Sequence, residues 1–215
     1  MKKLLLLLVI GGALWHYRYQ LPWGQVTGTI NPDGSAKTIF ITAEQCGKPC
    51  EQMEAQLKNL HVSYERKSFN LEDSSQLTEL LAYTHGSSQF PGLVIGAQVY
   101  LGYNPFELPF NVADGLGLQY LPRAQADIIG QSHFNADGSK KVIVYGTAWC
   151  PYCKKARELL GREGVAYEDV DVEQSTENMY RFKTLGGGGY PLLFVGARAL
   201  SGFDARKLHE LIEER

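Results

Sequence analysis

Cysteine is the residue type in this chain whose spacing points most directly to chemistry. The 215 residues contain four of them, Cys46, Cys50, Cys150 and Cys153, in two close pairs. A cysteine thiolate is both a nucleophile and a soft metal ligand, so such a pair can exchange disulfides or bind a metal ion. Loops this short constrain the unfolded chain little, and no cysteine is left for a wider disulfide framework. Both pairs are therefore expected to serve chemistry before structure.

The segments around Cys150 predict where this thiol lies. Residues 141–145 are a β-branched run typical of a strand, and residues 151–162 carry apolar side chains at helical spacing. Cys150 would stand at the N-terminus of that helix, where unpaired N–H groups and the helix dipole favour an anion, with Lys154 and Lys155 close by. Cys153, nearly one turn further in, could then attack a mixed disulfide formed on Cys150 and release the substrate as a thiol.

A metal ion is the competing interpretation of this pair. Zinc sites use two such pairs and bring four ligands to one ion. Cys46 precedes Cys150 by 104 residues and occupies the equivalent place in a repeat, so four ligands would converge only if two equivalent sites faced each other. We therefore expect a redox pair at Cys150 and Cys153 and no metal ion there.

The chain contains an internal repeat. The segment NPDGSAKTIFITAEQC from Asn31 matches NADGSKKVIVYGTAWC from Asn135, and FPGLVIGAQVYLGYNPFEL from Phe90 matches YPLLFVGARALSGFDARKL from Tyr190. The two blocks keep their order, at offsets of 104 and 100 residues, which indicates two copies of one module. Each copy predicts strand, helix, strand, helix, hairpin and helix, which is an α/β fold with helices on the faces of a mixed sheet.

Turn and capping signals complete the expected elements. In the second copy we expect strands at 166–172, 192–195 and 199–201, a helix over 175–185, and a last helix capped by Asp204. In the first copy we expect strands at 38–42, 63–69, 93–95 and 98–101. The end of the first copy differs, because Pro105 and Pro109 interrupt the segment that matches the last helix.

The domain organisation follows from this repeat. We expect a signal anchor or signal peptide over 1–24, a first domain over 25–114, a linker over 115–134 and a second domain over 135–215. The segment from Gly115 to Ile129 within and beside the linker is apolar enough to pack on one of the two domains.

The N-terminal segment predicts a membrane or export signal. Lys2 and Lys3 precede an apolar run from Leu4 to Trp15. The run is short for a spanning helix, which needs about 20 residues, and this favours a cleaved signal. The aromatic residues that follow suit a membrane interface and favour an uncleaved anchor. We expect a protein that is inner-membrane anchored or exported, with its body outside the cytoplasm; a body on the cytoplasmic face and a buried segment of a cytosolic protein are the alternatives.

The charge balance narrows the class of partner. The chain has 21 basic and 23 acidic residues and no basic stripe. Neither nucleic acid nor another highly charged partner is therefore expected, and a small or protein-borne substrate fits better.

The segments VIVYGTAWCPYCKKARELL, GGYPLLFVG and LSGFDARKL resemble the glutaredoxin family, which has a thioredoxin-like fold. The resemblance covers about Lys140 to Arg215 and implies two tandem thioredoxin-like domains, the first of them degenerate. It also implies that Cys150 is the nucleophile, Cys153 the resolving thiol and Pro191 a cis-proline beside the disulfide.

The same resemblance implies a groove for glutathione. Its members would be Tyr152 as a wall, the backbone at Tyr190, and Gly202, Phe203 and Asp204. Many glutaredoxins carry a lysine three residues before the nucleophile, where this chain has Thr147, so one charge-assisted contact is missing. Asp204 has a second interpretation as a helix N-cap.

The activity implied is thiol-disulfide exchange on protein or glutathione mixed disulfides, contributing to cell redox homeostasis. The partners would be disulfide-containing proteins or glutathione, and the membrane through the N-terminal segment. No bound cofactor is expected, and glutathione is a possible co-substrate.

The first pair allows three interpretations. Cys46 and Cys50 have three residues between them, one more than Cys150 and Cys153, and Pro91 and Gly102 take the positions of Pro191 and Gly202. The pair could be a second redox site or electron relay, a degenerate structural copy, or a copper site of a metal-binding or scaffold module. Thiolates select Cu(I), and the histidines nearest in sequence are His61 and His85.

Overall fold

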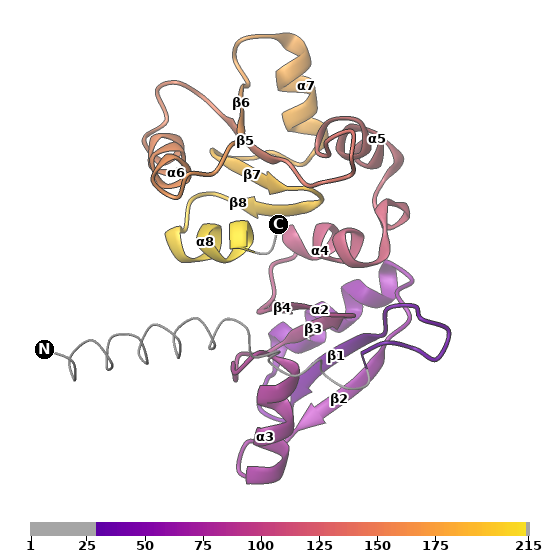
Figure 1. Cartoon of the computed structure of the whole chain (residues 1–215). Coiled ribbons are helices and arrows are strands. Elements are labelled where there is room, and N and C mark those ends of the chain that lie inside the picture. Colours follow the sequence, from indigo (N-terminus) through magenta and orange to yellow (C-terminus); the bar gives the residue numbers. More distant parts are fainter. Residues whose placement is uncertain (1–28, 214–215) are drawn as a thin grey trace, which may run out of the picture. The chain divides into compact units, whose positions relative to one another are not determined.

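The computed structural model describes residues 29–213, which form two compact units (Figure 1). One unit comprises residues 29–45 and 64–101, and the other comprises residues 46–63 and 102–213. The signal or anchor predicted over 1–24 lies outside the described residues.

The first unit is built on a four-stranded mixed sheet in the order β2-β1-β3-β4. The central strand β1 (Thr38–Ala43) is parallel to β2 (Glu65–Phe69) and antiparallel to β3 (Gly92–Ile95), which forms a hairpin with β4 (Gln98–Leu101). Every residue of β1 is buried, as expected for a β-branched run in the middle of a sheet.

Helix α3 (Ser74–Tyr83) completes the core of the first unit. The Asp73 side chain caps it by accepting hydrogen bonds from the backbone N–H groups of Ser75 and Gln76. The buried side chains of this core come from α3 and the sheet: Ile39, Ile41, Phe69, Leu80, Tyr83 and Val94.

The second unit repeats the same sheet with the order β6-β5-β7-β8. Strand β5 (Val142–Gly146) is parallel to β6 (Glu168–Asp171) and antiparallel to β7 (Leu192–Val195), which forms a hairpin with β8 (Arg198–Ser201). Two mixed sheets of identical topology, each with helices, confirm the predicted fold class of two tandem thioredoxin-like sheets. The repeat in the sequence is thus a repeat in the fold.

The remaining helices of the second unit match the apolar spacing of the sequence. Helix α6 (Pro151–Arg162) has its predicted bounds and buries Ala156, Leu159 and Leu160. Helix α7 (Thr176–Thr184) begins after its N-cap Ser175. Helix α8 (Ala205–Glu213) buries Leu208, Leu211 and Ile212 on one face.

Helix α2 (Lys48–Asn59) begins two residues after Cys46, holds Cys50 in its first turn and belongs to the second unit. A proline stands in its first turn, where the missing N–H group has no intrahelical partner to lose. The Gln56 side chain donates to the carbonyl of Pro105 at 2.8 Å and accepts from the hydroxyl of Tyr103 at 2.9 Å.

The interruption predicted at Pro105 and Pro109 is wrong, because a helix forms there. Helix α4 (Glu107–Leu116) starts after Pro105 and holds Pro109 within its first turn, where a proline costs no hydrogen bond. This helix packs on β8, and its buried Asp114 forms an ion pair with Lys140 at 2.9 Å. Helix α4 is therefore part of the second unit.

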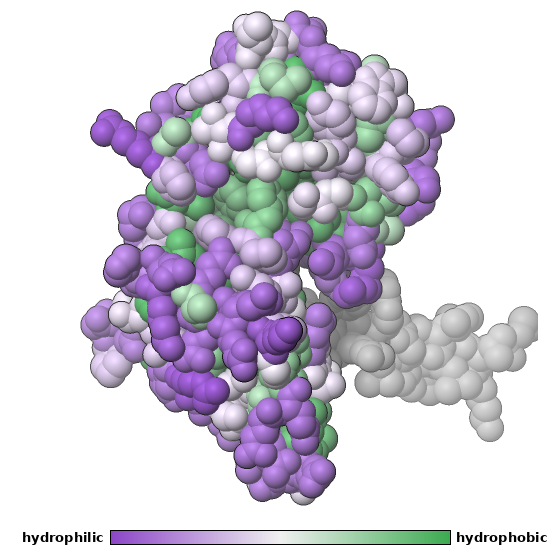
Figure 2. Space-filling view, turned by 180° about the vertical axis from the view of Figure 1, so that it is seen from behind, coloured by the Kyte–Doolittle hydropathy of each residue, from purple (hydrophilic) through white to green (hydrophobic). Residues whose placement is uncertain are grey.

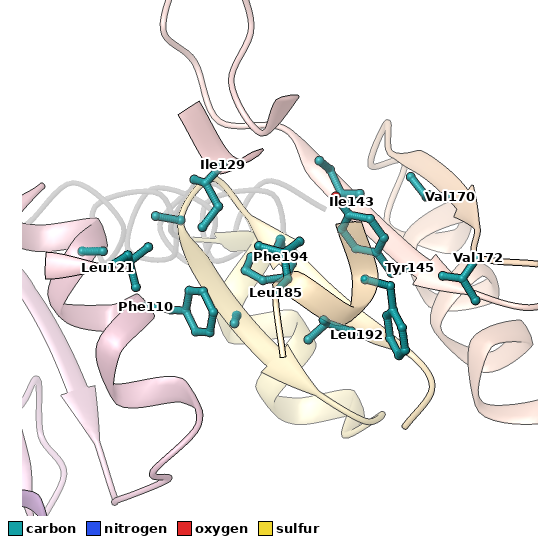
Figure 3. Packing of buried hydrophobic residues seen from close by; sticks show 14 residues of the cluster. Phe110, Leu121, Ile129, Ile143, Tyr145, Val170, Val172, Leu185, Leu192 and Phe194 are labelled. Carbon is teal, nitrogen blue, oxygen red and sulfur yellow. The ribbon is translucent and has the colours of Figure 1, made fainter. Parts of the chain in front are cut away.

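The residues predicted as a linker are also structured. Residues 115–134 hold the end of α4, a 3₁₀ helix (Leu118–Tyr120) and α5 (Arg123–Ser132). One hydrophobic cluster joins these segments to the sheet (Figure 3). It contains Phe110 of α4, Leu121 before α5, Ile129 of α5, and Tyr145 and Phe194 of the sheet. The predicted packing of this apolar segment on a domain is what the structure has.

His133 is the C-cap residue of α5, and its side chain forms hydrogen bonds to the second sheet. Its Nδ1 lies 3.0 Å from the Gly196 carbonyl and its Nε2 lies 3.0 Å from the Tyr145 hydroxyl. A carbonyl only accepts, so Nδ1 carries the proton and the tyrosine donates to Nε2. Burial lowers the pKa of His133 to about 4 and raises that of Tyr145 to about 12. The histidine is therefore neutral at pH 7.

Surface hydropathy and helix length both bear on the question of a membrane-spanning segment. On the face shown in Figure 2, hydrophobic residues are interspersed with hydrophilic ones, as on most globular proteins. Over residues 29–213, no helix has both the length and the apolarity needed to cross a bilayer.

Candidate active site

Cys150 lies where β5 leads into α6. Strand β5 ends at Gly146 and α6 begins at Pro151, so Cys150 is the N-cap residue of the helix. Its Sγ accepts a hydrogen bond from the backbone N–H of Cys153 at 3.1 Å. This sulfur thus occupies the position where a helix N-terminus favours negative charge.

The two cysteines form a disulfide in this structure. Their Cα atoms are 5.2 Å apart, within the usual range for such a bond. Cys150 keeps 4% of its surface exposed and Cys153 keeps none. Of the two sulfurs of the pair, the one at the helix N-terminus is thus the one that solvent or a substrate reaches first.

The same end of the sheet carries the proline segment. Leu192 of β7 pairs with Tyr145 of β5 and with Ser201 of β8, which places Pro191 and Gly202 beside the end of β5. The peptide before Pro191 is cis, and the backbone N–H of Gly202 donates to the Pro191 carbonyl at 2.8 Å. The same end of the sheet therefore holds Cys150, Cys153, Pro191 and Gly202.

Two exposed aromatic residues stand next to the cysteines in the sequence. Trp149 and Tyr152 are 66% and 54% exposed, unusually high values for large apolar side chains. The Trp149 ring packs edge-on against Tyr190 at 5.9 Å between centroids, and Tyr190 packs on the buried Phe182 at 5.0 Å. The Trp149 indole N–H also donates to Glu173 at 3.0 Å. Sequence reasoning did not single out Trp149, although it directly precedes Cys150.

Two members of the predicted glutathione groove have structural roles. The Asp204 carboxylate accepts hydrogen bonds from the backbone N–H groups of Arg206 and Lys207, both at 3.0 Å, and these bonds hold its pKa below the usual value. It is thus the N-cap of α8. Phe203 is partly buried against the core beneath α8. Their roles toward a ligand stay predictions.

Thr147 offers nothing to a ligand at the surface. Its side chain is fully buried, and its hydroxyl has no hydrogen-bond partner within residues 29–213. A lysine at this position in many glutaredoxins would supply a cation, and here neither a charge nor an exposed polar group replaces it.

Arg157 lies on α6, about one turn after Cys153. Its Nε donates to the Asp169 carboxylate at 2.9 Å, and its Nη1 donates to the Thr147 carbonyl at 3.3 Å. The side chain is only 20% exposed. The sequence alone did not identify it, because spacing on one helix does not show which strand faces an arginine.

The first cysteine pair also forms a disulfide, between Cys46 and Cys50, with Cα atoms 5.8 Å apart. The peptide before Pro91 is cis, but Pro91 belongs to the other compact unit. His61 and His85, the histidines considered for copper, both adopt positive φ angles. Across the described part of the chain, no three side chains of His, Cys, Asp and Glu gather as a metal site.

Comparison with known proteins gives a consistent match. A protein-family model described as Glutaredoxin matches residues 142–199. The chain is 34% identical over 71 residues to a glutaredoxin of Pseudomonas aeruginosa, covering 33% of this chain and 82% of that protein. It is 40% identical over 67 residues to glutaredoxin 1 of Rickettsia conorii, covering 30% and 66%. A solved glutaredoxin from Archaeoglobus fulgidus matches with a TM-score of 0.32 at 29% identity, covering 38% and 97%.

Proposed function

Because the chain belongs to the glutaredoxin family, we propose that it catalyses thiol-disulfide exchange on protein or glutathione mixed disulfides through Cys150 and Cys153. The observation that carries this proposal is the placement of Cys150 as the N-cap of α6, with its sulfur accepting the N–H of Cys153. This position stabilises a thiolate, which is the form that attacks a disulfide.

The proposed cycle starts from the reduced pair. The Cys150 thiolate attacks one sulfur of a substrate disulfide, which forms a mixed disulfide and releases the first substrate thiol. Cys153 then attacks the Cys150 sulfur, which closes the Cys150–Cys153 disulfide and releases the second thiol. Two electrons pass to the substrate and two protons complete its thiols. A thiol reductant such as glutathione returns the pair to the dithiol, so no prosthetic group is needed.

The exposed rings beside Cys150 favour polypeptide substrates over glutathione alone. Trp149 and Tyr152, close to Cys150 in the sequence, present exposed apolar area, and Glu173 adds a negative charge near Trp149. Glutathione carries two carboxylates. The buried Thr147 supplies no positive charge to pair with either of them, and the carboxylate of Glu173 repels them. A protein disulfide with apolar neighbours fits this surface better.

The test compares full-length proteins reducing two substrates, a glutathione mixed disulfide and a protein disulfide. Cys150→Ser is expected to abolish both activities, and Cys153→Ser to stop protein disulfide reduction at a trapped mixed disulfide. Cys46→Ser is the matched control, since it removes a thiol from the other pair; a loss there as well would indicate an electron relay. Full activity in Cys150→Ser would overturn the proposal.

The location outside the cytoplasm and the anchoring segment remain part of this proposal. Both depend on residues 1–24, and accessibility of Lys154 or Lys155 to a membrane-impermeant reagent in intact cells would test on which side the body lies.

A further inference from the structure

Arg157 is placed to act on Cys153. It follows Cys153 by four residues on α6, so the two side chains lie on the same helix face. The guanidinium is not free to move, because Asp169 of β6 holds Nε and the Thr147 carbonyl holds Nη1. Four-fifths of the side chain is buried by this arrangement.

Gly146 shows how close the cation and the sulfur lie. A Cβ atom added at Gly146 would stand 2.8 Å from the Cys153 sulfur and 3.5 Å from Nη2 of Arg157. The sulfur and the guanidinium thus share one small space at the end of β5, left open because residue 146 has no side chain. The distance from the sulfur to Nη2 is at most the sum of these two, about 6.3 Å. That upper bound is close to the limit of about 6 Å over which an opposite charge stabilises an anion.

The second step of the proposed cycle needs such a cation. Cys153 must lose its proton to solvent before its sulfur attacks Cys150, yet it has no exposed surface, and burial disfavours a thiolate. An arginine stays protonated at any pH in question, so it can offset this cost without exchanging a proton itself.

Resting on the proposed function, we propose that Arg157 is a positioning residue that stabilises the thiolate of the resolving Cys153. The thiolate forms a bond to the Cys150 sulfur, the bond from Cys150 to the substrate sulfur breaks, and the departing substrate thiolate takes up a proton from solvent. Arg157 remains bonded to Asp169 and to the Thr147 carbonyl throughout.

Other charges near this thiol oppose or only weakly support the same effect. Asp169 partly neutralises Arg157, and Asp171 of β6 pairs in register with Gly146. On α6 itself, Lys154 is 76% exposed and pairs with Glu158 at 3.8 Å, so water and the carboxylate screen it. Lys155 lies over the Tyr152 ring at 5.3 Å.

The test titrates Cys153 by the ultraviolet absorbance of its thiolate in the full-length chain. Cys46, Cys50 and Cys150 are replaced by serine, so that Cys153 is the single thiol. In this background Arg157→Gln is expected to raise the pH midpoint of thiolate formation by about one unit, the lower end of the usual effect because Asp169 shares the cation. Arg157→Lys should restore part of the shift.

Two further variants separate electrostatics from folding. Asp169→Asn keeps an oxygen for Nε and removes the opposing charge, so it is expected to lower the midpoint. Lys154→Gln removes the same charge as Arg157→Gln from the next position after Cys153, and should change the midpoint little because that lysine is exposed. A midpoint that Arg157→Gln leaves unchanged, or that both Arg157→Gln and Asp169→Asn raise, would overturn the inference.

A kinetic measurement completes the test. With the four cysteines present, release of substrate from the Cys150 mixed disulfide at pH 7 is expected to be about tenfold slower in Arg157→Gln, while its formation is unchanged. Formation and release changing equally would contradict the inference. Failure of the proposed function would appear separately, as substrate reduction that survives Cys150→Ser.

Discussion

The buried His133 makes the stability of the second unit depend on pH. Its pKa falls from 6.5 to about 4 in the folded chain, chiefly because burial disfavours the imidazolium. The unfolded chain therefore binds more protons than the folded chain between these values, and folding becomes less stable as pH falls. Above about pH 6.5 the contribution is complete, and it is lost progressively down to about pH 4.

The size of this effect follows from the shift. Each unit of pKa corresponds to about 1.4 kcal/mol, so a shift of about 2.5 units removes about 3 kcal/mol of unfolding free energy across the window. That is a large share of the roughly 5–15 kcal/mol that stabilises a typical domain. Carboxylates with lowered pKa values, such as Asp204, add to the loss at the acid end of the window.

A matched variant isolates the histidine from these carboxylates. Asn in place of His133 keeps a donor for the Gly196 carbonyl and cannot titrate, so its stability should vary less with pH. Urea unfolding of the full-length chain and of His133→Asn, followed from pH 7.5 to pH 4, is expected to show the advantage of the original protein shrinking by about 3 kcal/mol.

Nuclear magnetic resonance gives the direct check. The His133 ring signal, assigned by its loss in the variant, should show no titration between pH 7.5 and pH 5. A ring that titrates near pH 6.5, or a stability difference that is constant across the window, would refute the reasoning from burial.

Three further predictions concern the site. Gly146→Ala would place a Cβ 2.8 Å from the Cys153 sulfur and is expected to slow disulfide closure and destabilise the unit by about 1–3 kcal/mol, measured by stopped-flow oxidation and thermal unfolding; unchanged rates would contradict the crowding. Asp204→Ala should cost about 1 kcal/mol in chemical denaturation, whereas Asp204→Asn, which also caps, should cost little; equal losses would argue against capping. Trp149→Ala should lower kcat/KM for a protein disulfide about fivefold, near 1 kcal/mol, with Tyr180→Ala as an equally exposed control; equal effects of the two would contradict a substrate surface at Trp149.

Much of the second module could be predicted because its signals are local. The apolar spacing over 151–162 sets the face of α6, and the proline after Cys150 marks its first turn, so both bounds agree with the structure. The Asp204 cap and the hairpin at Gly196 likewise depend on a few consecutive residues. The placement of Cys150 at a strand-to-helix junction followed from these elements alone.

The segment between the modules was harder to predict. The prolines at 105 and 109 indicated a break, yet a proline in the first turn of a helix loses no hydrogen bond, and α4 forms. The apolar residues over 115–134 indicated packing without indicating a partner. Only the folded chain shows that Phe110, Leu121 and Ile129 contribute to the core beside Phe194.

The sequence by itself determined the repeat, the order of strands and helices, and the cysteine pair at the start of α6, because helical and strand periods and capping act between neighbouring residues. The tertiary structure decided the burial of Cys150, the support of Trp149 by Tyr190 and Glu173, and the approach of Arg157 to Cys153. These three features depend on strands and helices that are distant in the chain and pack together only in the folded protein. The charge and the burial around a thiol depend on this packing between distant segments, and no local pattern in the sequence encodes them.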